Sequence, residues 1–327
     1  MSEVLKLCKK AKAASVELAK FSTTDKNKAL ANMADTLMAN QKSILEANEK
    51  DLEEGRKRCI SSALMDRLLL NSKRIEEMSK GLHEVIGLRD PIGEVVKGWR
   101  VSNGLIITQV RVSLGVVGII YEARPNVTVD ATGLCIKTGN AVVLRGSSVA
   151  INSNLALTKV ISEAASKTGL PLHSVQLLSN TSREAASELM KMHQYIDVLI
   201  PRGGASLIQS VIENATIPVI ETGVGNCHVY VDKAANQNMA LKIVLNAKIQ
   251  RPGVCNAAET LLVHKEIARD FLPRALKELT EKKVEIFGCP VTKSLFSEAK
   301  NASEEDWHTE YLDLKLAVKV VDSLDKA

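Results

Sequence analysis

The 327-residue sequence lacks the features that would place it in a membrane or on a nucleic acid. Its longest purely apolar stretches, such as residues 115–120, are far too short to cross a hydrocarbon core about 30 Å thick. The N-terminal segment alternates lysine with apolar residues and contains no continuous apolar run, which excludes a secretory signal. The 43 basic and 38 acidic side chains leave a net charge of +5, spread along the chain without a block of like charges. We therefore expect a cytoplasmic protein with neither membrane nor nucleic-acid partners.

The common metal and nucleotide motifs are also missing. The chain has no H-E-x-x-H, no cysteine–histidine zinc spacing, no G-x-x-x-x-G-K-[ST] and no G-x-G-x-x-G, so we expect neither a metal site nor a standard dinucleotide fingerprint. Its six cysteines lie far apart without a C-x-x-C pair, and a chain of this kind keeps them reduced. The question that follows is whether one of these thiols is a nucleophile.

The composition is that of a globular protein, with 45% apolar and 25% charged residues, and the length allows two or three domains. Helical spacing dominates roughly the first ninety residues. Two β-rich runs between about 94 and 112 then meet at Ser102, Asn103 and Gly104. Asn-Gly predicts a hairpin with a type I′ turn, in which two residues have positive φ. Such a hairpin either contacts another subunit or covers its own domain.

From Gly115 onward, short β-branched runs alternate with helical stretches. The candidate strands are GVVGII, AVVLRG, SVQLL, IDVLI, IPVI, CHVYV, ETLLV and VEIFG. This alternation predicts an α/β protein built on mainly parallel sheets with helices on both faces. We place a domain boundary close to His228, giving a first domain over residues 1–227 and a second over residues 228–327.

Ligands in open parallel sheets bind beyond the carboxyl ends of the strands, beside helix N-termini. Four predicted strand ends carry an arginine or glutamate next to small residues, over residues 121–126, 145–148, 201–204 and 221–223. Each turn alone is compatible with an ordinary loop. Their occurrence at successive strand ends favours an anion-binding edge.

A thiol occupies the loop over residues 250–258, where proline and glycine precede Cys255. Arg251 nearby would favour the thiolate, which is the reactive form of cysteine. Lone cysteines are more often small buried residues than nucleophiles. Spacing alone therefore leaves the role of Cys255 open.

These segments carry a family resemblance. The runs VSLGVVGIIYEARPNVTVDATGLCIKTGNAVVLRGSS, IPRGG, IETGVGNCHVYVD and QRPGVCNAAETLLVH resemble the γ-glutamyl phosphate reductases, the proline-biosynthesis branch of the aldehyde dehydrogenase superfamily. The resemblance covers essentially the whole chain. It implies an aldehyde-dehydrogenase-like fold with an NADP-binding domain, a catalytic domain and a protruding oligomerisation hairpin. The implied reaction is the NADPH-dependent reduction of L-glutamyl 5-phosphate to L-glutamate 5-semialdehyde and phosphate.

The resemblance also implies roles for individual residues. Cys255 matches the thiol that forms a thioester, and Asn126 matches the oxyanion-hole asparagine, with the backbone N–H of Cys255 as a second donor. Cofactor contacts are implied for Arg145, Gly146 and Ser147 at the 2′-phosphate of NADP, for Pro201, Arg202, Gly203 and Gly204 at the pyrophosphate, and for Glu310 at the nicotinamide ribose.

Glu221 matches the residue that activates water in hydrolytic aldehyde dehydrogenases. Here Thr222-Gly223-Val224-Gly225 follows in place of the usual Leu-Gly-Gly, and a reductase does not hydrolyse its thioester, so we expect a structural or proton-handling role. Arg124 and Arg251 are candidates for gripping the substrate phosphate or α-carboxylate through bidentate hydrogen bonds. The alternative for both arginines is an ordinary ion pair.

Members of the family continue past the point corresponding to Ala327, so we expect the second domain to be incomplete at its C-terminus. The resemblance implies a homo-oligomer, either a dimer or a tetramer, and the glutamate kinase that supplies the acyl phosphate as a further partner. Two alternatives remain open: a hydrolytic or CoA-acylating aldehyde dehydrogenase, which Glu221 permits, and an inactive nucleotide-binding relative.

Overall fold

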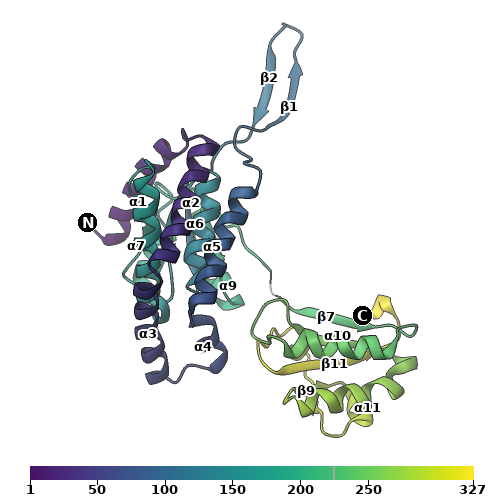
Figure 1. Ribbon diagram of the computed structural model, residues 1–327. Helices are drawn as coiled ribbons and strands as arrows, with labels where there is room; N and C mark the ends of the chain where they lie inside the picture. Colours follow the sequence, from purple (N-terminus) through teal and green to yellow (C-terminus); the bar gives the residue numbers. More distant parts are fainter. Residues whose placement is uncertain (224) are drawn as a thin grey trace. The chain divides into compact units, whose positions relative to one another are not determined.

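The chain forms two compact units in the computed structural model, Met1–Thr222 and Gly223–Ala327 (Figure 1). The division lies slightly before the boundary that the sequence predicts. The structure describes residues 1–223 and 225–327, so Val224 of the predicted Glu221 segment lies outside the described residues. None of the described helices has the length and apolarity needed to cross a membrane.

The first unit is built on a parallel sheet of four strands in the order β5-β4-β3-β6. The strands are β3 (Val116–Tyr121), β4 (Ala141–Arg145), β5 (Val175–Leu177) and β6 (Val198–Arg202). The helices are α1 (Glu3–Leu18), α2 (Thr23–Ala39), α3 (Gln41–Lys57), α4 (Ser62–Leu68), α5 (Ser72–Gly87), α6 (Asn126–Lys137), α7 (Ile151–Lys167), α8 (Arg183–Leu189) and α9 (Ala205–Asn214), with a 3₁₀ turn η1 (Ser148–Ala150) before α7. Strand β3 is buried along its whole length, as expected for a strand covered on both faces.

The predicted hairpin is present as β1 (Val95–Arg100) and β2 (Ile106–Val110), an antiparallel pair that extends away from the helices of its unit (Figure 1). The predicted type I′ turn is wrong. Gly104 N donates to Val101 O at 2.9 Å, Val101 N donates to Leu105 O at 2.9 Å, and of the three loop residues only Gly104 has a positive φ, +92°. A single left-handed glycine closing a three-residue loop satisfies the strand twist without forcing Asn103 into that region.

The segment IPVI does not form the predicted strand. Val219 makes a single parallel bridge to Leu199, in which Leu199 N donates to Pro218 O and Ile220 N donates to Leu199 O, each at 2.9 Å. Pro218 has no N–H to continue a ladder, which limits the pairing to this bridge. Glu221 therefore follows an isolated bridge beside β6 and not the end of a strand.

The second unit is a parallel sheet of five strands in the order β10-β9-β11-β8-β7. The strands are β7 (Cys227–Val231), β8 (Ala258–His264), β9 (Glu285–Gly288), β10 (Lys300–Asn301) and β11 (Lys315–Val321). The helical elements are α10 (Gln237–Ile249), α11 (Lys265–Glu281), α12 (Pro290–Leu295), η2 (Glu305–Trp307) and η3 (Leu324–Lys326). Strand β8 is buried throughout, and its apolar residues pack with α10 and α11. The predicted fold class, parallel sheets with helices against them, is confirmed.

Candidate functional site

Three of the four predicted turns lie at one edge of the first sheet. Ile120, near the end of β3, is in register with Arg145 on β4 and with Pro201 on β6. Because the three strands are parallel neighbours, their carboxyl ends meet at this edge. The ends of these strands and the residues that follow them include the predicted site residues Arg124, Asn126, Arg145, Gly146, Ser147, Pro201, Arg202, Gly203 and Gly204.

The Arg145 guanidinium is held at the end of β4, and its buried Nε is without a partner among the described residues. Its Nη2 donates to the carbonyls of Thr181 at 2.8 Å and Ser182 at 3.4 Å. Burial lowers the pKa of Arg145, but an arginine side chain is not deprotonated in proteins. The site therefore presents a half-buried cation with a buried N–H still to be satisfied.

Position 146 has room only for glycine, because the side chains of Asn154 and Tyr121 pack against it. A Cβ at this position would lie 2.2 Å from Asn154 Nδ2 and 3.0 Å from Tyr121 Cζ. Those side chains belong to a buried network in which the Tyr121 hydroxyl and Thr128 Oγ1 are 2.7 Å apart and Thr128 Oγ1 donates to Asn154 Oδ1 at 3.1 Å. The neighbouring Ser147 Oγ accepts from Val149 N at 3.4 Å, at the start of η1.

The turn after β6 leads into the N-terminus of α9. Pro201 is buried, Arg202 is exposed, and Gly204 is the N-cap with no side chain to cap the helix. The first backbone N–H groups of a helix have no partner within it, and a helix N-terminus favours an anion. This turn is therefore able to receive a phosphate group.

Asn126 begins α6 and is exposed. Its Nδ2 donates to Asp130 Oδ2 at 2.9 Å, one turn along the same helix, which orients the amide. Arg124 is half-buried, and its backbone N–H donates to Glu122 O at 2.7 Å. Glu221 is exposed, beyond the bridge at Val219.

In the second unit, Cys255 and Glu310 both lie close to Gly225. A Cβ on Gly225 would be 2.7 Å from Cys255 O, 3.1 Å from Cys255 Cβ and 2.8 Å from Glu310 Oε1. Only glycine leaves room for this approach. The Cys227 thiol donates to Cys255 O at 3.3 Å, and Arg251 is exposed in the same loop. Two residues 55 positions apart in the chain (310 − 255) are thus brought to one place.

The cysteines differ in their access to solvent. Cys255 and Cys59 are exposed, whereas Cys8 and Cys135 are buried. Burial raises the pKa of Cys8 and Cys135 to about 12, with a contribution from the Glu188 charge at Cys8. These two remain protonated at neutral pH and are poor nucleophiles. Cys255 combines exposure with a loop position beside Glu310, whereas Cys59 follows the end of α3.

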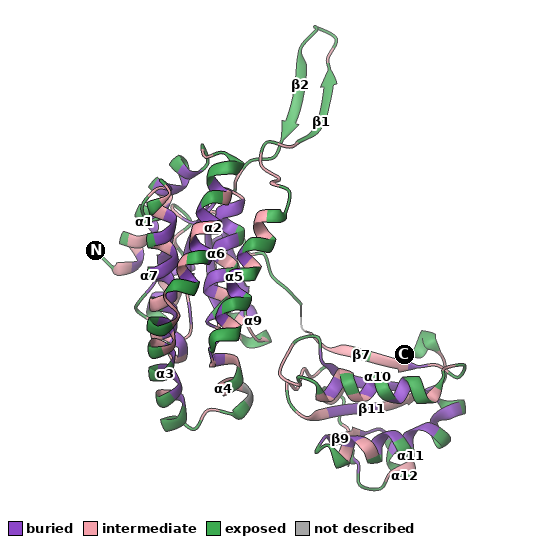
Figure 2. Ribbon diagram, in the orientation of Figure 1, coloured by how far each residue is buried: buried purple, intermediate pink, exposed green. Residues whose placement is uncertain are grey.

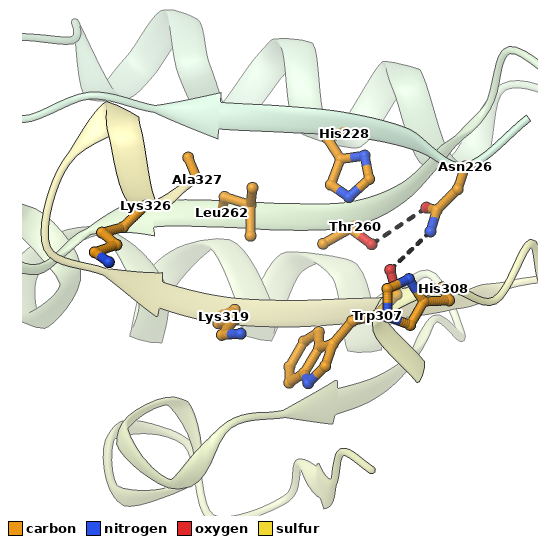
Figure 3. Close-up of a pocket in the computed structure, with 9 residues that line it drawn as sticks. All are labelled: Asn226, His228, Thr260, Leu262, Trp307, His308, Lys319, Lys326 and Ala327. Atoms are coloured by element: carbon orange, nitrogen blue, oxygen red, sulfur yellow. Dashed lines mark hydrogen bonds between the residues drawn. The ribbon is translucent and has the colours of Figure 1, made fainter. Parts of the chain in front are cut away.

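A pocket of about 600 Å³ lies on the sheet of the second unit (Figure 3). It is lined by Asn226, His228, Thr260, Leu262, Trp307, His308, Lys319, Lys326 and Ala327, none of which sequence analysis predicted to be a site residue. Asn226 Nδ2 donates to Trp307 O at 2.9 Å, and Lys319 Nζ lies 4.9 Å from the centre of the Trp307 ring. Asn226 directly follows Gly225, so one end of the pocket adjoins the place where Cys255 and Glu310 meet.

Sequence analysis also missed a buried ion pair. Lys248 Nζ lies 2.7 Å from Glu259 Oε2, and both side chains are fully buried. One feature of the sequence could have indicated this pair. Lys248 lies at the end of a helical pattern before the Cys255 loop, and Glu259 lies at the start of the apolar strand after it.

The chain has two α/β units, one with arginine and glycine in the turns at its strand ends and one with an exposed loop thiol. Residues 1–294 match the aldehyde dehydrogenase family. γ-Glutamyl phosphate reductase from Heliobacterium modesticaldum is 61% identical over 319 residues, which cover 98% of this chain and 76% of the relative. The same enzyme from Thermoanaerobacter pseudethanolicus is 56% identical over 325 residues, covering 99% and 78%. The crystal structure of γ-glutamyl phosphate reductase from Thermotoga maritima aligns with a TM-score of 0.90 at 48% identity, covering 99% of this chain and 78% of that one.

The chain belongs to the γ-glutamyl phosphate reductases of the aldehyde dehydrogenase family, a family of NAD(P)-dependent oxidoreductases. The predicted family membership is confirmed. The chain spans roughly three quarters of the length of the relatives it matches.

Proposed function

We propose that this chain reduces L-glutamyl 5-phosphate to L-glutamate 5-semialdehyde and phosphate with NADPH, as a step of proline biosynthesis. The observation that carries the proposal is the 53–61% identity, over nearly the whole chain, to relatives named γ-glutamyl phosphate reductase. The exposed loop thiol of Cys255 supports the same chemistry.

Cys255 is the proposed nucleophile. Its thiolate attacks the acyl carbon, a C–S bond forms, and the C–O bond to phosphate breaks, which leaves a thioester. Hydride addition to the thioester carbon and expulsion of the thiolate then release the aldehyde. Both steps pass through a tetrahedral oxyanion, for which the Asn126 amide and the backbone N–H of Cys255 are the proposed donors.

The first unit is the proposed NADP-binding domain and the second the proposed catalytic domain. Arg145 with Gly146 and Ser147 would hold the 2′-phosphate, and the unsatisfied Nε of Arg145 supports this role. The Gly204 end of α9, reached through Pro201, Arg202 and Gly203, would hold the pyrophosphate, because its N-cap carries no capping side chain. Glu310 would hold the nicotinamide ribose. When bound, NADPH supplies the hydride.

Three residues have proposed roles at the substrate. Arg124 and Arg251 would bind its phosphate or α-carboxylate, which guanidinium groups recognise in bidentate fashion. Glu221 would serve a structural or proton-handling role. It would not activate water, because hydrolysis of the thioester would release the carboxylic acid and no aldehyde would form.

The choice of acyl acceptor tests the proposed reaction. In the oxidative direction, L-glutamate 5-semialdehyde and NADP⁺ should yield NADPH only when inorganic phosphate is present, as measured by the absorbance of the reduced nicotinamide. Water as acceptor would indicate a hydrolytic aldehyde dehydrogenase, and coenzyme A an acylating one. No turnover with any acceptor, in protein that binds NADPH, would indicate an inactive nucleotide-binding relative.

We also propose that the β1–β2 hairpin mediates a homo-oligomer, either a dimer or a tetramer. Every residue of both strands is exposed, including Trp99 and Ile106 (Figure 2). A two-stranded hairpin is marginally stable alone, and exposed strand edges invite pairing. A cytoplasmic location and delivery of the acyl phosphate by a glutamate kinase remain proposals that follow from the reaction.

Aspartate at the hairpin surface is expected to weaken that assembly. The Trp99→Asp/Ile106→Asp protein should show a molar mass close to that of one chain by light scattering, while the parent protein shows a multiple of it. The matched control is Leu172→Asp, at an exposed apolar position outside the hairpin, which should keep the parent mass. A parent protein of single-chain mass would refute the oligomer, and an unchanged hairpin variant would place the interface elsewhere.

A further inference from the structure

The buried pair Lys248–Glu259 lies at the two ends of the loop that carries Cys255. Lys248 is in the last turn of α10 and Glu259 is the second residue of β8, so the pair closes residues 250–257, the Cys255 loop. Besides the 2.7 Å contact with Glu259 Oε2, Lys248 Nζ donates to Ala258 O at 2.8 Å. One ammonium group therefore joins the helix before the loop to the strand after it.

Glu259 reaches a third segment with its other oxygen. Oε1 accepts the backbone N–H of Leu312 at 3.1 Å. Leu312 has φ +53°, in the left-handed region that a bulky side chain rarely adopts, and such a conformation persists where its surroundings hold it. Glu310 lies two residues earlier, within residues 308–313, here called the Glu310 segment.

The two segments also meet at Gly225, where Cys255 and Glu310 both lie within about 3 Å of the position that a Cβ would occupy. A small movement of either segment would separate Cys255 from Glu310, because Gly225 has no side chain that could link them. The buried pair is the feature that contacts the ends of one segment and the backbone of the other.

We propose that Lys248 and Glu259 are positioning residues, which hold the Cys255 loop and the Glu310 segment in the arrangement that catalysis uses. Neither residue touches substrate or cofactor in this role. The proposal rests on the proposed function for the parts played by Cys255 and Glu310.

The electrostatics of the pair determine which variants are informative. Burial raises the pKa of Glu259 and lowers that of Lys248, and each charge offsets the other's shift. Removing one partner would leave the other buried without compensation, which destabilises strongly, whereas replacing both by apolar residues of similar volume is often tolerated. Variants with both residues replaced therefore distinguish an effect on the position of the two segments from a loss of folding stability.

The test compares Lys248→Met/Glu259→Met with Lys248→Met/Glu259→Gln in the full chain. The glutamine variant keeps an oxygen for the Leu312 N–H, and the methionine variant does not. The matched control is Lys26→Met/Asp90→Asn in the first unit, which removes a buried pair of 2.6 Å formed by residues outside both segments. The readouts are hydrogen–deuterium exchange of the two segments, the Kd for NADPH, and kcat and KM.

In the methionine variant, both segments are expected to exchange at least tenfold faster, the NADPH Kd to rise at least fivefold, and kcat to fall at least tenfold with little change in KM. In the glutamine variant, only the Cys255 loop should exchange faster, and the NADPH Kd should stay within twofold of the parent value. The control should match the parent in both segments.

Parent-like exchange of the Cys255 loop in both double variants would overturn the proposal, as would a glutamine variant in which the Glu310 segment exchanges as fast as in the methionine variant. If the methionine variant fails to fold, the glutamine variant alone tests the proposal. In that variant the Cys255 loop should exchange faster than in the parent protein, whereas the Glu310 segment should exchange at the parent rate. Exchange requires no turnover, so these outcomes are independent of whether Cys255 proves to be the nucleophile.

Discussion

Cys255→Ala is expected to lower kcat by about 10⁴-fold or more, because the acyl group then has no sulfur to which it can be transferred. Binding of NADPH should stay within about twofold of the parent value, since the proposed cofactor contacts of the first unit are untouched. The measurements are phosphate-dependent turnover of glutamate semialdehyde and NADPH binding by fluorescence.

Cys59→Ala is the matched control, because Cys59 is likewise exposed but follows the end of α3. It should retain the parent rate. A Cys255→Ala protein that turns over at the parent rate would show that another group accepts the acyl chain, and the proposed mechanism would be wrong.

Arg145→Glu is expected to weaken NADPH binding by about 100-fold, while NADH binding changes less than about fivefold. Reversing a charge beside the 2′-phosphate removes a charge-assisted hydrogen bond and adds repulsion, and a hundredfold change in Kd corresponds to roughly 2.8 kcal/mol. NADH has no phosphate at that position, so only contacts shared by both cofactors would affect it. Kd values from fluorescence titration measure the difference.

Arg183→Glu provides the same change of charge at an exposed position at the start of α8 and should leave both affinities within about twofold. Arg145 also donates hydrogen bonds to the carbonyls of Thr181 and Ser182, so its replacement could alter the fold as well as the cofactor site. The test therefore includes Arg145→Met, which removes the charge without reversing it, and a thermal unfolding measurement of each variant. If a folded Arg145→Glu protein bound NADPH and NADH with equally weakened affinity, the proposed contact between Arg145 and the 2′-phosphate would be wrong.

The local pattern of the chain predicted most elements but not their details. The hairpin residues 102–104 were recognised from Asn-Gly, yet the loop uses one left-handed residue where the expected turn needs two. IPVI has the apolar character of a strand, but Pro218 lacks the N–H that a ladder requires. Strand β11 was missed, because a segment with two lysines gives no local sign that it lies between β9 and β8.

The candidate site likewise has features that the sequence predicted and features that it did not. Turns at strand ends were visible because an arginine beside glycine after an apolar run is a local signal, and the register of β3, β4 and β6 places three of them together. Nothing local indicates that Arg145 binds the carbonyls before α8, that Gly146 is confined by Asn154, or that Lys248 meets Glu259.

By itself the sequence determined the alternation of strands and helices, the loop that carries Cys255 and the family, because periodicity, turn residues and long motifs are properties of contiguous residues. Only the tertiary structure decided which distant groups meet: Cys255 with Glu310 beside Gly225, and the Lys248 ammonium with the Glu259 carboxylate at the ends of the Cys255 loop. Those contacts depend on how whole helices and strands pack, and packing joins positions that no local pattern relates.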